Sequence, residues 1–330
     1  MKKEILVVAM GIALLSCKKD EPQAVNGRVV TGIISQDMVW HSDTVYEIAG
    51  KVVVQGADLT IQPGTVIKAR DGQGSLATAL IVSRGARLYA EGTAENPIVF
   101  TSIYDNGGNL DETDQGLWGG IVILGGAYIS ANDTTASIEG IPANEVYGSY
   151  GGTKNNGNSG VLRYISIKHG GTLLGGGNEL NGLTLGGVGN GTVIENIEVL
   201  GNLDDGIECF GGCVDITNAL VWAQGDDAYD IDQAYAGTIT NYVYIPGVDS
   251  DHGLEIDGPE GAYKDSFAMV GGYFTDTAEV HFRDFAEGSV NYSGFANVEA
   301  DAGTNVVVDT TAQYDLSVFS WTSAFASGKL

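Results

Sequence analysis

Short runs of alternating apolar and polar residues dominate the chain after residue 25, and helical periodicity is hard to find there. Typical runs are Lys51–Val54, Leu59–Ile61, Ala79–Val82 and Pro97–Thr101, with glycine, asparagine or aspartate between the runs. A period of two, punctuated by turn residues, is typical of β-strands. The pattern therefore predicts an all-β protein.

The second half of the chain repeats a short acidic motif. Leu203–Glu208 (LDDGIE) recurs as Gly225–Asp230 (GDDAYD) and again within Asp251–Asp257 (DHGLEID). A repeat of 20 to 25 residues that holds two or three short strands is typical of a solenoid. Because the repeats contain glycine turns and no helix, we predict a single-stranded parallel β-helix with coils of about 20–25 residues. A β-propeller, with blades of about 40 residues, is the weaker alternative.

A second repeated feature is an asparagine after an isoleucine. Asn196, Asn218 and Asn241 follow one another at intervals of 22 and 23 residues. We expect an internal asparagine ladder at a tight turn, in which each side chain bonds its neighbour's backbone. With about 4.8 Å per coil and about 13 coils, the rod would be roughly 60 Å long. No linker interrupts the pattern, so residues 27–330 are predicted to form one domain.

The N-terminus predicts export. Met1–Lys3 precedes an apolar run, Ile5–Leu15, that is too short to span a bilayer, and residues 1–17 match a signal peptide. Leu14–Cys17 resembles the bacterial lipobox, in which Cys17 is acylated; an ordinary signal peptide with a chance cysteine is the alternative. Residues 18–26 would be a tether, and Lys18–Glu21 is similar to the signal that sends Bacteroidetes lipoproteins to the outer face of the outer membrane. The resemblance implies an outer-membrane, lipid-anchored and surface-exposed protein.

Charge excludes several function classes. The chain has 42 acidic and 16 basic residues, and its formal charge is −26. Such a surface repels nucleic acid, and it repels anionic lipid headgroups and polyuronates unless cations intervene. Segments rich in the 49 glycines lack the helix that a phosphate-binding loop must open, so nucleotide binding is rejected as well.

The remaining cysteines, Cys209 and Cys213, allow two interpretations. On one straight strand their Cα atoms would lie about 13 Å apart, too far for a disulfide. A turn at Gly211–Gly212 would bring them within reach in an oxidising compartment, so a disulfide and free thiols both remain open. The histidines His41, His169 and His281 show no ligand spacing and are treated as incidental.

Several segments together are similar to a group of Bacteroidetes surface lipoproteins of right-handed parallel β-helix type. The resemblance spans nearly the whole mature chain and implies right-handed coils and lipid anchoring, but says little about activity. His252 stands where an asparagine is more usual in the group. The segments are Ala57–Lys68, Gly85–Gly92, Asn96–Ser102, Trp118–Leu124, Ile138–Pro142, Asn181–Gly187, Asp204–Glu208 and Trp321–Leu330.

The acidic motifs are expected to stack on successive coils. From their equivalent positions in the repeat, Asp205, Asp227 and His252 would form one row, and a second row would hold Glu208, Asp230 and Glu255. Like carboxylates about 5 Å apart repel, so they need hydrogen bonds from turn amides, bound Ca²⁺, or use as catalytic acids. Ca²⁺, the one candidate cofactor, takes six to eight oxygen ligands. The candidate ligands are Asp226, Asp227, Asp230 and Asp232.

The same motif order also resembles polygalacturonase-type glycoside hydrolases, which hydrolyse with inversion on a parallel β-helix. The resemblance implies Asp226 or Asp227 as general acid, with Asp205 among the carboxylates that activate water. His252 would then tune the site and Arg283 would bind substrate. The flanking residues depart from that family: Asn-Thr-Asp is absent, Asp251 replaces a glycine before His252, and Asp284-Phe285 follows Arg283.

These observations predict a lipid-anchored, surface-exposed scaffold that binds a glycan or a protein partner without chemistry. The alternative is a polysaccharide-degrading enzyme, either an inverting glycoside hydrolase or a lyase. Tyrosines would contribute either sugar-stacking surfaces or strand packing along the solenoid surface. The tyrosines concerned are Tyr147, Tyr150, Tyr229, Tyr235, Tyr242 and Tyr244.

Overall fold

The computed structural model of the chain describes residues 27–142, 144–173 and 180–330. The predicted signal peptide, Cys17 and the predicted tether all lie outside the described residues. No helix in the described part of the chain is long and apolar enough to cross a membrane.

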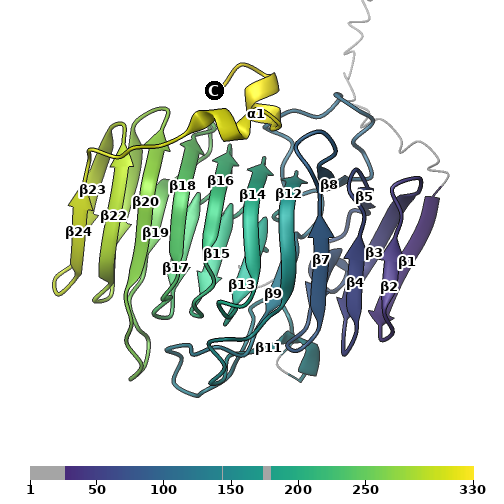
Figure 1. The fold of residues 1–330 in the computed structure, drawn as a ribbon, viewed down its shortest axis with the longest axis horizontal. Coiled ribbons are helices and arrows are strands. Elements are labelled where there is room, and N and C mark those ends of the chain that lie inside the picture. The colour runs from purple at the N-terminus through teal and green to yellow at the C-terminus, as the bar shows by residue number, and fades with distance from the viewer. Residues whose placement is uncertain (1–26, 143, 174–179) are drawn as a thin grey trace, which may run out of the picture.

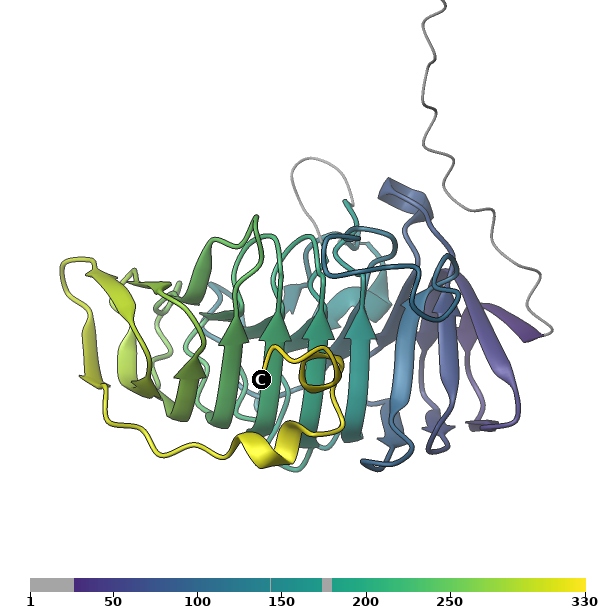
Figure 2. The same cartoon turned by 90° about the horizontal axis from the view of Figure 1, so that it is seen from above.

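Twenty-two strands form one continuous parallel sheet that winds into a solenoid (Figures 1 and 2). The strands of successive coils pair in register and make three stacks. The first stack holds β2 (Met38–Trp40), β4 (Asp58–Ile61), β7 (Arg87–Glu91), the first halves of β12 (Gly160–Lys168), β14 (Val193–Leu200), β16 (Ile216–Trp222), β18 (Thr238–Ile245), β20 (Phe267–Phe274) and β22 (Glu287–Ser293), and β24 (Asn305–Asp309).

The second stack continues each coil after a tight turn. It holds the first halves of β1 (Gly27–Ile34) and β3 (Val45–Val54), then β5 (Val66–Ala69), β8 (Ile98–Ser102) and the second halves of β12, β14, β16, β18, β20 and β22. The third stack holds the second halves of β1 and β3, then β6 (Ala79–Val82), β9 (Ile121–Leu124), β13 (Leu183–Gly186), β15 (Ile207–Phe210), β17 (Tyr229–Asp232), β19 (His252–Ile256), β21 (Ala278–Phe282) and β23 (Ala296–Ala300).

This architecture confirms the predicted all-β parallel β-helix. Each stack has ten strands in the described part of the chain, fewer than the roughly 13 coils predicted. Two long segments account for the difference, because they contribute no strand to the three stacks. Residues 125–159 form an excursion between β9 and β12 that carries the antiparallel pair β10 (Ala136–Ser137) and β11 (Ser149–Tyr150). Residues 310–330 follow the last coil.

The interior is a single apolar column that runs the length of the solenoid. Inward-facing isoleucine, leucine and valine side chains from all three stacks form it. Five of the six tyrosines considered above are buried, and the Oη of Tyr229 donates hydrogen bonds to the carbonyls of Ala219 and Val243 at 2.9 and 3.0 Å. Of the two expected roles for these tyrosines, sugar stacking is therefore wrong for the buried five. Four of them, Tyr229, Tyr235, Tyr242 and Tyr244, pack inside the solenoid rather than along its surface. Tyr150 instead packs from β11 against the outer side of the third stack.

The asparagine ladder is present at the turn between the first and second stacks. Asn196, Asn218 and Asn241 have φ values of 57°, 58° and 54°, a left-handed conformation that asparagine tolerates. The Nδ2 of Asn218 donates to Oδ1 of Asn196 at 3.0 Å, and Asn241 donates likewise to Asn218 at 2.7 Å. The bonds join side chain to side chain, so the predicted bonding to the neighbour's backbone is wrong.

The C-terminal residues form a strap that runs back across the outside of the second stack (Figure 2). The strap comprises residues 310–330, with the 3₁₀ turn η3 (Leu316–Phe319) and the short helix α1 (Ser323–Ala326). Phe319 is buried against β14, β16 and β18. The buried Glu198 accepts hydrogen bonds from the backbone amides of Ser323 and Ala324 at 2.6 and 3.2 Å. The predicted domain of residues 27–330 thus consists of coils followed by this strap.

Candidate functional site

A column of charged side chains follows the third stack. In β15, β17, β19 and β21 the apolar residues point into the core, so the alternate residues point outward. The strand register places Glu208 beside Asp230, Asp230 beside Glu255, and Glu255 beside His281. This confirms the predicted row of Glu208, Asp230 and Glu255, and extends it by one residue.

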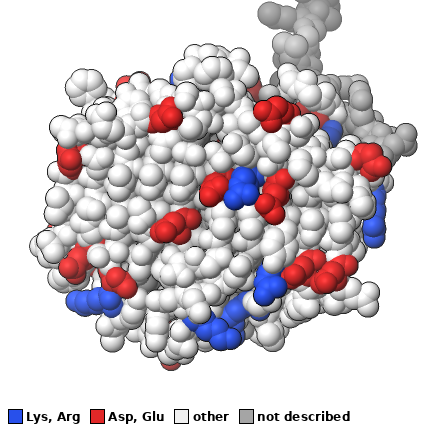
Figure 3. Space-filling view, viewed as in Figure 1, with Lys and Arg blue, Asp and Glu red and all other residues white. Residues whose placement is uncertain are grey.

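The column lies on strands that Figure 1 shows behind β14, β16 and β18. The face toward the viewer carries scattered charged side chains on a surface that is mostly neither acidic nor basic (Figure 3). The stacked carboxylates therefore form a distinct feature of one side of the solenoid.

The second predicted row lies just before these strands. Oδ1 of Asp205 accepts a hydrogen bond from the backbone amide of Asp227 at 3.0 Å. Oδ1 of Asp227 accepts from the backbone amide of His252 at 2.9 Å, and it lies 2.8 Å from Nδ1 of the same histidine. Asp205, Asp227 and His252 are thus brought together, and each aspartate caps an amide of the next coil.

Three carboxylates meet where the two rows adjoin. Asp205, Glu208 and Asp230 each place one oxygen within 4.8 Å of the other two. The amide nitrogen of Asn181 donates to Glu208, but the buried Oδ1 atoms of Asn181 and Asp230 have no hydrogen-bond partner among the described residues. Burial and the charges of neighbouring carboxylates raise the pKa values of Asp205, Glu208 and Asp230 well above the ordinary range. We call these three residues the carboxylate cluster.

Asp227 and the histidine that it contacts both have raised pKa values. Burial, with the charges of Glu255 and Asp226, raises the pKa of Asp227 to about 7 against the opposing effect of His252. Burial favours the neutral imidazole of His252, but the charge and hydrogen bond of Asp227 outweigh burial and raise the pKa of His252. Asp227 is therefore able to hold a proton at neutral pH.

Arg283 reaches the other end of the same strands. It directly follows β21, and its guanidinium lies 2.7 Å from Glu255 and 3.4 Å from Asp257. Glu255 therefore connects Arg283 to the column, while Asp227 and His252 lie at the beginning of the strands. The structure brings all five residues suggested by the hydrolase resemblance to one face, with Arg283 engaged in ion pairs.

The four candidate calcium ligands are divided among different groupings. Asp226 is exposed and lies with Asp204 and Asp205, whereas Asp230 belongs to the carboxylate cluster. Asp232 occupies the next outward position after Asp230, where it accepts from the amide of Gln233 at 2.5 Å. Burial raises the pKa of Asp232 to about 7 despite that bond.

Both cysteines are free thiols in the structure. Cys209 points into the core from β15, and burial raises its pKa. Cys213 lies after the turn at Gly211–Gly212, and its Sγ donates to the carbonyl of Asn155 at 3.2 Å. Of the two interpretations left open, the arrangement corresponds to free thiols.

Sequence reasoning missed two members of the site. His281 was treated as incidental, yet its ring centroid lies 5.9 Å from that of His252, and the two histidines and Glu255 offer ligand atoms within 4.8 Å of one another. Asn181 was missed because its segment, Leu180–Leu185, is a degenerate copy of the acidic motif and has no acidic residue. Counting one more repeat from Glu255 would have found His281, since the two residues pair in register.

Comparison with protein families identifies the domain. The family model described as a pectate-lyase-like β-helix domain matches residues 32–315, which include all of the site described above. A comparison with curated proteins and one with solved structures returned no match. On the evidence of its coils and of this match, the chain belongs to the family of pectate-lyase-like β-helix domains.

Proposed function

We propose that the protein is exported, anchored to the outer membrane through acylated Cys17 and exposed at the cell surface, where its third stack binds a polysaccharide without cleaving it. The leader, the lipobox-like Leu14–Cys17 and the following Lys18–Glu21 support export and anchoring. The family match supports a role connected with polysaccharides.

The exposed part of the column provides the binding groups. His252, Glu255, His281 and Arg283 have side chains between 18% and 37% exposed, so they are accessible while the sheet holds them in place. Two imidazoles and a guanidinium supply donors, and the carboxylate supplies acceptors. Convergent donors and acceptors on a rigid surface suit the hydroxyl groups of a sugar chain.

The mutual engagement of the carboxylates carries the non-catalytic part of the proposal. Asp205 and Asp227 cap backbone amides of the next coil, so these two carboxylates already serve the fold. Oxygens of Asp205 and Asp226 lie within 4.8 Å of each other. Inverting glycosidases separate their two carboxyl groups by about 6.5–9.5 Å to admit water. The Asp205–Asp226 pair leaves less room than that.

We also propose Ca²⁺ as the ion that the carboxylate cluster binds. The three carboxylates, among them the unpartnered Oδ1 of Asp230, and the unpartnered Oδ1 of Asn181 are the hard oxygen donors that Ca²⁺ prefers. An ion here would neutralise the mutual repulsion of Asp205, Glu208 and Asp230. It would also reduce the negative charge beneath the binding face.

The binding function is tested with neutral polysaccharides. We expect the purified protein to bind at least one of galactan, arabinoxylan and β-glucan in affinity electrophoresis and calorimetry, without releasing new reducing ends. Glu255→Gln should weaken binding at least about tenfold, because it removes a charged acceptor and frees Arg283. Glu287→Gln is the matched control, since Glu287 is exposed on the first stack. Failure to bind any of the three, or equal losses in both variants, would contradict the proposal.

A second candidate function, glycan hydrolysis, is favoured by one observation. The pKa of Asp227 near 7 is the value that a general acid needs at neutral pH. If the protein hydrolyses a glycan, Asp227→Asn should lower the release of reducing ends by roughly 10²-fold or more, whereas the exposed Asp249→Asn should leave it unchanged. Absence of product from the unmodified protein with all three polysaccharides would exclude these as substrates and leave binding.

A further inference from the structure

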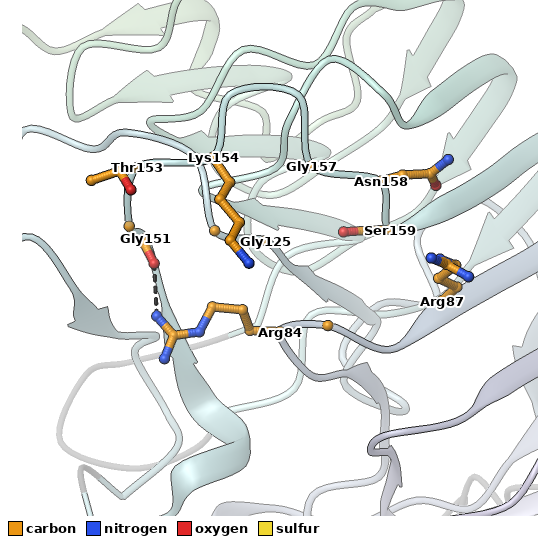
Figure 4. A pocket seen from close by; sticks show the side chains of 12 residues that line it. Arg84, Arg87, Gly125, Gly151, Thr153, Lys154, Gly157, Asn158 and Ser159 are labelled. Carbon is orange, nitrogen blue, oxygen red and sulfur yellow. Dashed lines mark hydrogen bonds between the residues drawn. The ribbon is translucent and has the colours of Figure 1, made fainter.

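A cavity of about 530 Å³ lies away from the acidic column, between the turn that joins β6 to β7 and the excursion of residues 125–159 (Figure 4). Its volume is in the range of pockets that hold small ligands. In the preceding coil, β6 and β7 are joined by a turn of only four residues, 83–86. The excursion occupies the equivalent place in the next coil, between β9 and β12. The residues that line it include Arg84, Arg87, Gly126, Gly152, Lys154 and Ser159.

The charge of this cavity is opposite to that of the molecule. Three basic side chains, Arg84, Arg87 and Lys154, line it, and no acidic residue does. The whole chain has only 16 basic residues against 42 acidic ones. The cavity is therefore a local positive site that attracts anions, on a molecule whose overall negative charge repels them.

These cations are available to a ligand. All three are exposed. Within the described part of the chain, Arg84 and Lys154 form no ion pair, and Arg87 has only a 3.6 Å contact with Asp58. One guanidinium nitrogen of Arg84 donates to the carbonyl of Gly151 at 2.7 Å, which orients the side chain and leaves its other donors for a ligand. Four other cations, Arg70, Arg163, Arg283 and Lys329, are each paired with a carboxylate and are therefore less available.

The surrounding groups suit an oxyanion rather than a bare hydrocarbon. Figure 4 shows Lys154 descending from the excursion toward Arg84, with Arg87 on the far side and the hydroxyl of Ser159 pointing into the space between them. Glycines line much of the wall; a Cβ at Gly152 would lie 2.7 Å from the carbonyl of Gly126. The missing side chains let the two ends of the excursion approach each other closely and leave room beside the cations.

We propose that this cavity binds a sugar that carries a tetrahedral oxyanion, a sulfate or phosphate ester, through Arg84, Arg87 and Lys154. Cations that approach from two different loops can surround a tetrahedral group, whereas a carboxylate is satisfied by one planar guanidinium. The rest of the cavity accommodates the sugar ring. The site is independent of the acidic column and of the function proposed for it.

The test uses calorimetry with glucose 6-sulfate, glucose 6-phosphate, glucuronate and glucose. We expect one or both esters to bind at least about tenfold more tightly than glucose and glucuronate, and the two ester arms show which oxyanion is preferred. Lys154→Gln should weaken ester binding at least about tenfold with little change in Tm, because its amino group forms no hydrogen bond with the residues that the structure describes. Lys264→Gln, an exposed lysine outside the cavity, is the control and should change the Kd by less than about twofold.

Two results would overturn the proposal. One is glucose or glucuronate binding as tightly as both esters, which would remove the selectivity for a tetrahedral oxyanion. The other is an equal loss in Lys154→Gln and Lys264→Gln, which would indicate long-range charge instead of a site. Glu255→Gln should leave ester binding intact. A failure of the cavity to bind the esters can therefore be distinguished from a failure of the third stack to bind polysaccharide.

Discussion

The free energy of unfolding of this protein is expected to fall as the pH rises from about 4 to 8 in the absence of divalent cations. Asp227 and Asp232 have pKa values raised to about 7, and those of Asp205, Glu208 and Asp230 are raised well above their ordinary values, chiefly by burial. The unfolded chain releases these protons near pH 4, so above that pH the folded state binds more protons than the unfolded state. These groups therefore make their full contribution to the free energy of unfolding below about pH 4. That contribution is lost as the pH rises past their folded pKa values.

His169 opposes this trend, because burial lowers its pKa and its contribution to stability therefore grows as the pH rises toward 7, but it is a single group against five carboxylates. The remaining shifted groups do not reverse the trend. His252 has a raised pKa and so loses its contribution in the same direction. Hydrogen bonds to Thr113 are the largest contribution to the lowered pKa of Asp111, and Asp105 also has a lowered pKa. Those two stabilise the fold above about pH 4 and lose that contribution only below it. We expect a Tm at pH 8 that is lower than at pH 5 by roughly 5 °C or more, corresponding to a few kcal/mol.

Calcium should restore the lost stability at pH 8. The ion binds ionised carboxylates, so it should add roughly 3 kcal/mol at a concentration about 100 times its Kd. Scanning calorimetry at pH 5 and pH 8, with EDTA and with Ca²⁺, measures both effects. Asp230→Asn should reduce the pH dependence, because it removes one charge from the carboxylate cluster, while the exposed Asp249→Asn should not. A Tm that rises from pH 5 to pH 8 in EDTA would show that these carboxylates ionise in the folded protein at little cost.

The column was predictable from sequence because a solenoid converts a linear period into spatial contact. Once Glu208, Asp230 and Glu255 are recognised as equivalent positions in successive repeats, their adjacency follows from strand pairing. The groupings within the site were harder to predict. Asp226 and Asp227 are adjacent in the chain, but Asp226 is exposed and Asp227 is buried. Neighbours in sequence thus alternate in direction, while the groups that meet come from different coils.

Features that interrupt the repeat could not be predicted from the sequence pattern. Asn181 donates to Glu208 from a degenerate repeat, and Glu198 binds the amides of a strap more than 120 residues later in the chain. The cationic cavity also depends on such a break, because Lys154 belongs to the excursion and Arg84 to an ordinary turn. A period identifies equivalent positions, but it contains no information about where an insertion folds back.

Asn218→Ala is expected to lower the free energy of unfolding by about 3 kcal/mol. Asn218 is the central member of the ladder: it donates to Asn196 and accepts from Asn241. Loss of two half-buried hydrogen bonds costs about 1 kcal/mol each. Alanine in a left-handed conformation, at the φ of 58° found here, adds about 1 kcal/mol more. Urea unfolding followed by circular dichroism measures the difference.

Asn218→Gly separates the two causes, since glycine adopts the left-handed conformation without strain but cannot form the ladder. If both causes act, the glycine variant should be less stable than the unmodified protein and more stable than the alanine variant. A glycine variant as stable as the unmodified protein would show that the asparagine is needed only for its backbone conformation. The ladder also reaches the strap, because Asn241 exchanges hydrogen bonds with the backbone of Asp315 at 3.1 and 2.8 Å. Loss of the ladder should therefore loosen the strap as well, because the side-chain amide of Asn218 helps to hold Asn241 in the orientation that binds the strap.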